Sequence, residues 1–195
     1  MTIEEIASAA EAVLVAKIVD VKRSRVNTAD GIFPSAAELG ESPIGDLIVL
    51  TDVEVDVTEM LRATSPELNF DEGASVALTI GGGSYTTVLS AEQADILGMT
   101  GDHDSAALDA ELVPQAADDL TITYGNAPAA SLAEGEVVVL FLVEHQIDGF
   151  GDTPQLTLLA PVHPDAILRP DGVGGWLGPG GEAADLPALI ELVGP

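Results

Sequence analysis

Residues 52–57 read Asp-Val-Glu-Val-Asp-Val, an unbroken alternation of acidic and apolar side chains. Successive side chains of a β-strand point to opposite faces, so the valines share one face and the acids share the other. This pattern predicts a long strand over residues 46–61, with valines toward a core and acids toward solvent. Same-face side chains lie about 6–7 Å apart, too far for three carboxylates to hold one cation without help from loops.

Further strands are predicted on both sides of this segment. Residues 12–26 begin with a run that is apolar on both faces, as is typical of a strand at the centre of a sheet. Residues 73–80 alternate again and end at Gly81-Gly82-Gly83, which we interpret as a turn or bulge because the Gly-Lys-Ser/Thr continuation of a nucleotide loop is missing. The remaining candidates are residues 120–124, 137–143 and 155–160, followed by a turn at Asp171-Gly172.

Short helices are predicted from their capping residues. A Ser or Thr stands three residues before a Glu or Gln at two helix starts, and an aspartate can cap a third. These starts are Thr2, Ser90 and Asp185. The last helix, within residues 183–193, is expected to pack on the rest of the protein.

The chain is expected to form a single, mainly β domain over residues 1–195. Its length is within the range of one domain with one sizeable core. Two segments lack a clear period and contain turn-forming or acidic residues, so we interpret residues 27–45 and 99–119 as long loop excursions between strands.

The charge balance limits the classes of partner. The chain has 33 acidic residues against 6 Lys and Arg, a formal net charge of -27, while 47% of its residues are hydrophobic. Such a charge repels phosphate backbones and anionic lipids, so we expect neither nucleic acid nor membrane insertion. Because the acids are dispersed, we favour a surface adapted to high salt, where screening removes self-repulsion; an acidic protein of an ordinary medium is the alternative.

Cysteine is absent, so disulfides, thiolate metal sites and cysteine nucleophiles are excluded. The first residues show no basic segment followed by an apolar run, so no signal peptide is visible, and no stretch is apolar over the ~18 residues of a membrane span. If the protein is exported, its signal has been removed from this chain or it leaves the cell by another route.

Few residues suggest catalytic chemistry. The nucleophile motif Gly-x-Ser-x-Gly and the zinc motif His-Glu-x-x-His do not occur, and His103, His145 and His163 are far apart in sequence. Asp102 and Asp104 flank His103 and are candidate metal ligands, with Ca²⁺ the ion that such oxygens suit, although a full calcium-loop pattern is missing. We therefore expect no catalytic residues, no enzyme activity and no resident cofactor.

Most of the cations are close together in sequence: Lys17, Lys22, Arg23 and Arg25 are four of the six. They can form an anion site. The interpretation we prefer is that they pair with neighbouring carboxylates and protect an aggregation-prone strand.

The order of these segments resembles a netrin-like or OB-like β-barrel domain found in exported microbial proteins, with haloarchaea among the expected sources. The resemblance is carried by residues 12–19, 51–61 and 76–82, by Gly135-Glu136-Val137-Val138-Val139-Leu140-Phe141-Leu142, and by Asp171-Gly172. It implies a Greek-key barrel with a short N-terminal helix and a packed C-terminal helix. It also implies a non-enzymatic accessory or adhesive role, with no catalytic residues to carry over.

Two functional hypotheses follow, and a weaker third. The first is an extracellular or surface-exposed module that binds a protein or a glycan. The second is a structural subunit of a larger assembly, such as a virion decoration or connector, or the surface layer of a halophile. The third is a metal-dependent hydrolase whose zinc ligands come from distant segments.

Overall fold

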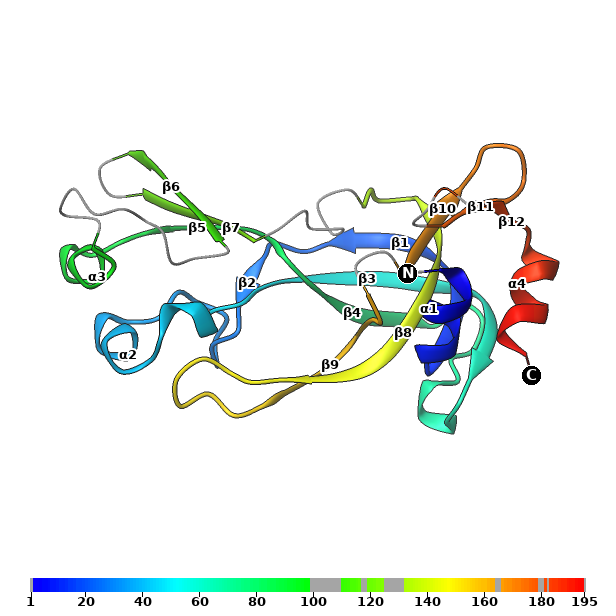
Figure 1. Ribbon diagram of the computed structural model, residues 1–195, viewed down its shortest axis with the longest axis horizontal. Helices are drawn as coiled ribbons and strands as arrows, with labels where there is room; N and C mark the ends of the chain where they lie inside the picture. Colours follow the sequence, from blue (N-terminus) through cyan, green and yellow to red (C-terminus); the bar gives the residue numbers. More distant parts are fainter. Residues whose placement is uncertain are drawn as a thin grey trace.

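The computed structural model describes residues 2–98, 110–116, 119–124, 132–163, 166–178, 181 and 183–194. Within these residues the chain is mainly β, as predicted, with an open antiparallel sheet of nine strands and a second sheet of three (Figure 1). The main sheet contains β1 (Ala12–Val21), β2 (Arg25–Val26), β3 (Val49–Ala63), β4 (Ser75–Gly81), β8 (Val137–Ile147), β9 (Leu156–Pro161), β10 (Ile167–Pro170), β11 (Trp176–Leu177) and β12 (Ala183–Ala184). The second contains β5 (Gly83–Val88), β7 (Asp119–Tyr124) and β6 (Ala110–Ala116).

Strand β1 lies at the centre of the main sheet. Leu14 pairs with Met60 of β3 along one edge and with Leu140 of β8 along the other. Leu14 and its neighbour Val15 point to opposite faces of the strand, and both are buried. The prediction of a central strand with two apolar faces is confirmed.

Strand β3 contains the alternating acids and valines. Val53, Val55 and Val57 are at most 2% exposed, whereas the acids between them lie on the opposite, partly solvated face. Strand β4 pairs along the other edge of β3, with Val76 opposite Val55. The predicted long strand and its buried valine face are confirmed.

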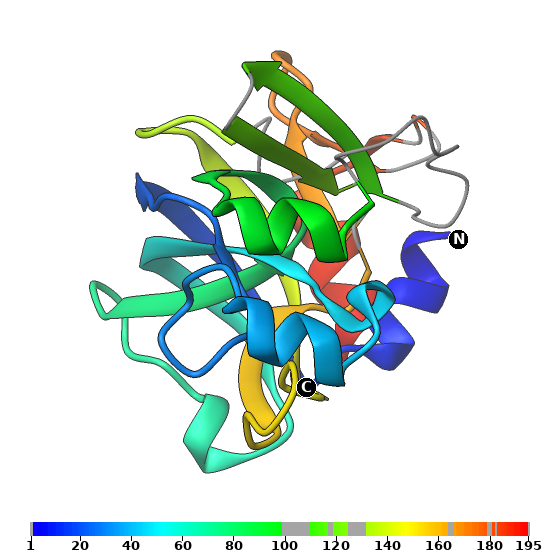
Figure 2. The same cartoon turned by 90° about the vertical axis from the view of Figure 1, so that its left-hand side faces the viewer.

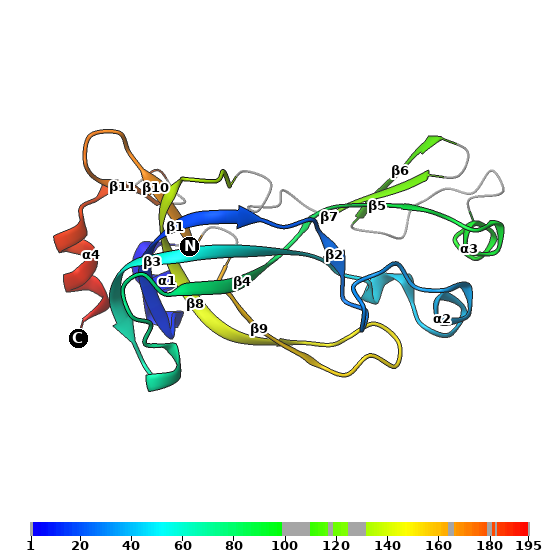
Figure 3. The same cartoon turned by 180° about the vertical axis from the view of Figure 1, so that it is seen from behind.

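Apolar layers cover both faces of the main sheet. One face packs against itself as the strands curve, bringing Leu14, Val55 and Leu140 into one cluster. On the other face, Ile6 of α1 (Ile3–Ala9) and Leu189 of α4 (Leu186–Val193) pack in the same cluster as Val13 and Phe141. The two helices lie side by side at one end of the elongated molecule (Figure 3). We call this end, with β10 to β12 and the β3–β4 connection (residues 64–74, including the 3-10 helix Pro66–Leu68), the helix end.

The opposite end contains α2 (Ala36–Glu41), the 3-10 helix Ile44–Asp46, α3 (Ala91–Ile96) and the β8–β9 connection, residues 148–155. Figure 2 looks onto this end and shows α2 and α3 next to each other. A third apolar cluster holds these segments together, with Phe33 before α2, Leu89 before α3 and Phe150 in the β8–β9 connection. We call this end, which also includes residues 27–35 and the end of β5, the loop end.

The predicted helix starts are confirmed. Thr2 and Ser90 each form a capping box, and Asp185 accepts a hydrogen bond from the backbone N–H of Ala188. The last helix begins later than the predicted residues 183–193, because Ala183 and Ala184 form the short strand β12.

Each of the two predicted loop excursions includes a regular element. Residues 27–45 contain α2, which starts with a capping box between Ser35 and Glu38. Residues 99–119 contain β6, an edge strand of the second sheet. Pro114 is tolerated there because an edge strand pairs with a neighbour on one side only, so the N–H that proline lacks is not required for pairing. The prediction of a loop was wrong for Ala36–Glu41 and for Ala110–Ala116.

Candidate functional site

The main sheet passes into the second sheet at a junction formed by β2, β3, β4 and β5. Gly82 and Gly83 both have positive φ angles, 104° and 133°, and redirect the chain from β4 into β5. Gly83 lies so close to β3 that an added Cβ would overlap Thr51 Oγ1 and Ser24 Oγ. The predicted turn or bulge at the three glycines is thus a bend between two sheets, and it requires glycine at residue 83.

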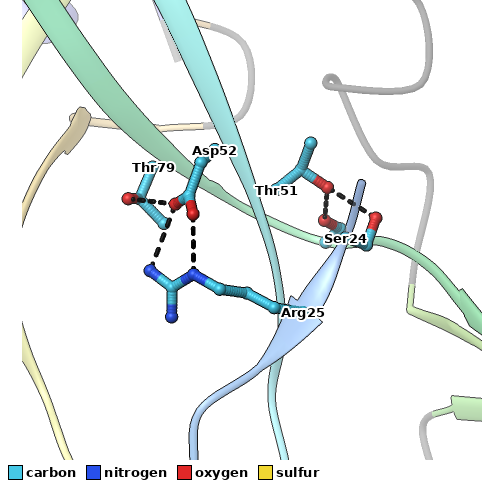
Figure 4. Close-up of polar contacts among 6 residues, drawn as sticks. Ser24, Arg25, Thr51, Asp52 and Thr79 are labelled. Carbon is cyan, nitrogen blue, oxygen red and sulfur yellow. Dashed lines mark hydrogen bonds and ion pairs between the residues drawn. The ribbon is translucent and has the colours of Figure 1, made fainter. Parts of the chain in front are cut away.

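A bidentate ion pair holds β2 against β3 at this junction (Figure 4). Arg25 Nε donates to Asp52 Oδ2 at 2.7 Å and Nη2 donates to Oδ1 at 3.1 Å. Thr79 of β4 donates its hydroxyl to Asp52 Oδ1 at 2.8 Å. Burial opposes the ionisation of Asp52, but the hydrogen bonds from Arg25 and Thr79 outweigh it and hold the pKa of that carboxyl below its usual range.

Two hydroxyls complete the junction. Ser24 Oγ and Thr51 Oγ1 are 2.8 Å apart, and Thr51 donates to the backbone carbonyl of Gly82 at 2.9 Å. A nucleophilic hydroxyl needs an adjacent base, whereas these hydroxyls bond to each other and to a carbonyl. The junction is therefore suited to fixing the second sheet on the first.

Asn27 fixes the loop end from inside. Its side chain is fully buried and donates from Nδ2 to the carbonyls of Asp46 at 3.0 Å and Asp148 at 3.1 Å. Its Oδ1 accepts from the N–H of Ile48 at 2.7 Å, and its own carbonyl accepts from the N–H of Phe150 at 2.8 Å. One residue thus ties the connection after β1 to the connection after β8.

Two further hydrogen bonds attach the second sheet to the same end. The N–H of Phe33 donates to the Tyr85 hydroxyl of β5 at 3.1 Å. Gln93 of α3 donates from Nε2 to the carbonyl of Pro34 at 2.6 Å. With the apolar cluster beneath them, these bonds make the loop end a fixed platform of three connections. A platform of loops on a rigid sheet is the usual arrangement of a binding surface.

The predicted metal ligands Asp102 and Asp104, with His103, lie outside the described residues. His145 is exposed on β8 beside a hollow of about 210 Å³ that Ile80 and Pro161 also line, and His163 is half-buried near the end of β9. Over the described ranges no three histidine or acidic side chains gather closely enough to hold a metal ion.

The preferred interpretation of the cations, pairing with carboxylates, is confirmed for Lys22 and Arg25. Lys22 bonds to Asp20 and also lies 3.4 Å from Glu54 Oε2. Lys17 and Arg23 are exposed.

Sequence reasoning missed two features of these sites. Asn27 gave no signal, because a lone asparagine after a strand usually indicates a turn. Asp52 was expected to face solvent with the other acids of its strand, but its side chain is only 34% exposed and is bonded to Arg25. Arg25 reaches Asp52 because the chain returns through β2 and pairs with β3. The spacing of these residues in the sequence does not reveal that pairing.

Comparison of the chain with protein-family models, with curated proteins and with solved structures found no match. None of the helices in the described ranges is long and apolar enough to cross a bilayer.

Proposed function

We propose that this chain is a non-catalytic binding or structural module, with an acidic surface adapted to high salt, that works in an extracellular or surface-exposed setting. Its partner is a protein or a glycan. The observation that carries the proposal is the loop end, where Asn27 and an apolar cluster hold three connections in one fixed arrangement. Loops held this firmly lose little conformational entropy when a partner binds.

We further propose that five strands of the main sheet form an OB-like barrel. The five strands follow one another around the barrel in the order β1, β3, β4, β9 and β8, and β8 is again next to β1. The support is that β4 packs beside β9 and that both run parallel to β1, since each is separated from β1 by two antiparallel pairings. In an OB-fold the connections after the first and fourth strands contact oligosaccharides or oligonucleotides. Here those connections meet at the loop end, and the net charge favours the sugar.

The test is cross-linking of the tagged chain in its source cells, followed by identification of what it carries, and a defined glycan array at high salt. A loop-end variant, Glu92→Lys, is compared with a variant of the same charge change on the β3–β4 connection, Glu67→Lys; both glutamates are exposed. Binding that only the loop-end variant loses supports the proposal. Binding that both variants keep contradicts it.

The second candidate is a structural subunit of a larger assembly, such as a virion or a halophile surface layer. The observation that favours it is the placement of exposed apolar side chains at both ends of the molecule. The weaker candidate, a metal-dependent hydrolase, is tested by metal analysis of the purified protein: stoichiometric zinc bound through histidines would revive it and contradict the non-catalytic proposal.

A further inference from the structure

Two strand edges of the main sheet face each other without being paired. Strands β4 and β9 lie side by side where the sheet curves round (Figure 3). Within the described residues, β4 pairs with β3 alone and β9 pairs with β8 alone. We call the space between these two edges the seam. An unpaired strand edge presents a row of backbone N–H and C=O groups, which is a template for an added strand.

Backbone hydrogen bonds show which groups of β4 face the seam. The N–H of Gly82 donates to the carbonyl of Val49 at 2.7 Å, and the N–H of Val57 donates to the carbonyl of Ala74 at 2.9 Å. Both bonds continue the register of β4 with β3, so the even-numbered residues of β4 are the ones that bond to β3. The odd-numbered residues direct their backbone groups into the seam, and these are Ser75, Ala77, Thr79 and Gly81.

The two edges of the seam differ in how they are protected. The N–H of Val162 donates to the carbonyl of Phe141 at 2.9 Å, so by the same alternation the backbone of Pro161 faces the seam. Proline has no N–H, and it is one of the residues that protect an edge against pairing. Strand β4 reads Ser-Val-Ala-Leu-Thr-Ile-Gly, with no proline and no charged residue. The free edge of β4 is therefore the one that accepts a strand.

The seam also interrupts the acidic surface. Residues 73–91, which include β4, contain no Asp, Glu, Lys or Arg, and no longer run of this kind occurs in a chain whose net charge is -27. Residues 153–164, which include β9, contain none either. Next to β4, Asp52 is paired with Arg25. Depletion of charge is typical of the centre of an interface, and it favours an uncharged partner segment here.

A hollow of about 210 Å³ opens at the seam. Ile80 and Gly81 line it from β4, and Ala160 and Pro161 line it from β9. The remaining lining residues are Val143, His145 and Val162. No atom lies within 4 Å of a Cβ added to Gly81, so the hollow is open beside this residue. An apolar cavity of ~150 Å³ can hold a benzene ring, so this hollow has room for a leucine or phenylalanine side chain.

We propose that an extended, uncharged peptide segment of a partner protein adds as a strand to the free edge of β4 and places one apolar side chain in the hollow. Alternating N–H and C=O groups select a polypeptide, because a sugar has no such row. Main-chain hydrogen bonds supply affinity in this mode of binding, and the hollow supplies specificity. A strand between two others needs them about 10 Å apart, so the seam widens wherever β4 and β9 lie closer. This site is separate from the loop end and goes beyond the proposed function.

The test begins with a displayed library of randomised seven-residue peptides, from which the wild-type protein selects binders in concentrated KCl. We expect the selected peptides to lack charged residues and to share one large apolar position. Replacing that residue by glycine should weaken binding at least ~10-fold, since a buried leucine or phenylalanine contributes about 1.5–3 kcal/mol. A library that yields no binder overturns the proposal.

N-methylation of the selected peptide tests the backbone pairing without changing the protein. One form is methylated at alternate amides and a second form at the other alternate amides. Only one of these two sets of N–H groups bonds to β4 in an added strand, so one form should lose binding and the other should keep it. Equal binding of the two forms, whether lost or kept, overturns the proposal.

Two variants place the peptide at the seam. Ala77→Pro removes an N–H that faces the seam and does not bond to β3, and Ala160→Leu fills the hollow. The matched controls are Ala91→Pro and Ala91→Leu, because Ala91 is exposed at the first position of α3, where proline is tolerated. We expect each seam variant to bind the peptide at least ~10-fold more weakly than its control, with circular dichroism to check folding.

Seam variants that bind like their controls overturn the proposal. So does a wild-type dimer, seen by size-exclusion chromatography, that Ala77→Pro dissociates, because a second copy then occupies the edge of β4. Binding at the loop end is judged separately with Glu92→Lys, so the failure of either site leaves the other standing.

Discussion

At the scale of single residues, the buried amide of Asn27 makes three of the hydrogen bonds that hold the loop end. We expect Asn27→Ala to lower the free energy of unfolding by roughly 3 kcal/mol, because two carbonyls and one N–H lose their partner and each buried unsatisfied group costs ~1–3 kcal/mol. Denaturant titration in concentrated KCl measures the difference. Asn69→Ala, at an exposed asparagine of the helix end, is the control and should change stability by less than ~0.5 kcal/mol. Equal effects at the two residues would contradict a structural role for Asn27.

The bend between the sheets depends on Gly83. We expect Gly83→Ala to destabilise the protein by ~2 kcal/mol or more, since the added methyl meets two hydroxyl oxygens and alanine rarely adopts a φ of 133°. Gly81→Ala, two residues earlier, has a permitted φ and open space around its Cβ, so it should be nearly neutral. Thermal unfolding of the two glycine variants tests this prediction. Similar midpoint temperatures would mean that β5 does not lie where we describe it.

The Arg25–Asp52 pair gives a prediction about pH. The pKa of Asp52 in the folded protein lies below the ordinary 3.8, so its stabilising contribution is complete above that value and is lost as the pH falls through the folded-state pKa. The two side chains are 29% and 34% exposed, so solvent screening limits the contribution to about 1 kcal/mol. Asp52→Asn should cost that much at neutral pH and progressively less in acid, measured by denaturant titration at each pH. Asp56→Asn, at an exposed acid of the same strand, is the control at neutral pH and should change the free energy of unfolding by less than ~0.5 kcal/mol.

These residues also mark how far the sequence could predict a site. The alternation in β3 correctly assigned the buried valines, because the period of two directly fixes which face each side chain occupies. It could not identify Asp52 as a paired acid, since the partner arrives from a two-residue strand with no pattern of its own. The candidates Asp102 and Asp104 were chosen for their spacing, and they lie outside the described residues.

At the scale of elements, α4 is anchored through Leu189. Among the α4 side chains that the structure describes, Leu189 is the one with an exposure near zero, so we expect Leu189→Ala to cost about 2–4 kcal/mol through lost burial and a residual cavity. Ile190→Ala, next to it but 45% exposed, should cost less than ~1 kcal/mol. Hydrogen exchange of α4 compared with α1 is the sharper measurement: the Leu189 variant should raise exchange in α4 first. Equal costs for the two variants would mean that α4 packs differently.

The elements that the sequence predicted well are those with a local physical signature. Capping boxes depend on a spacing of three residues, and they located the starts of α1 and α3. The same spacing at Ser35 and Glu38 was overlooked because glycines and prolines around it indicated a loop. Strand β6 had no local signature, since it is specified by pairing with β7 and contains a proline. Elements defined by a partner strand were thus the ones that sequence alone could not place.

At the scale of the whole molecule, composition predicted the class of surface but not its layout. The counts of acids and apolar residues indicated a folded, strongly acidic body, because both quantities are sums over the chain. The division into a loop end and a helix end depends on contacts such as those of Phe150 with the segments before α2 and α3, which are far apart in sequence. The proposed binding and assembly surfaces therefore follow from the tertiary structure alone.

The proposed adaptation to salt would be a property of the whole charge distribution, and it predicts a particular dependence of stability on KCl. A folded body with a net charge of -27 repels itself more than its expanded unfolded chain does, and the screening length falls from about 10 Å at 0.1 M salt to about 3 Å at 1 M. The free energy of unfolding should therefore rise steeply up to roughly 1 M KCl and slowly beyond it.

Changing five exposed glutamates to glutamine removes charge without removing a described hydrogen bond. The set is Glu41, Glu59, Glu67, Glu72 and Glu134, all exposed. If self-repulsion causes the salt dependence, this variant should be more stable than the wild type at low salt. The free energies of unfolding of the two proteins should converge as KCl increases, because salt then screens the same repulsion that the substitutions remove. Parallel curves would show that the salt acts through hydration of apolar surface, as sulfate and other excluded solutes do. The acidic surface would then need an explanation other than adaptation to salt.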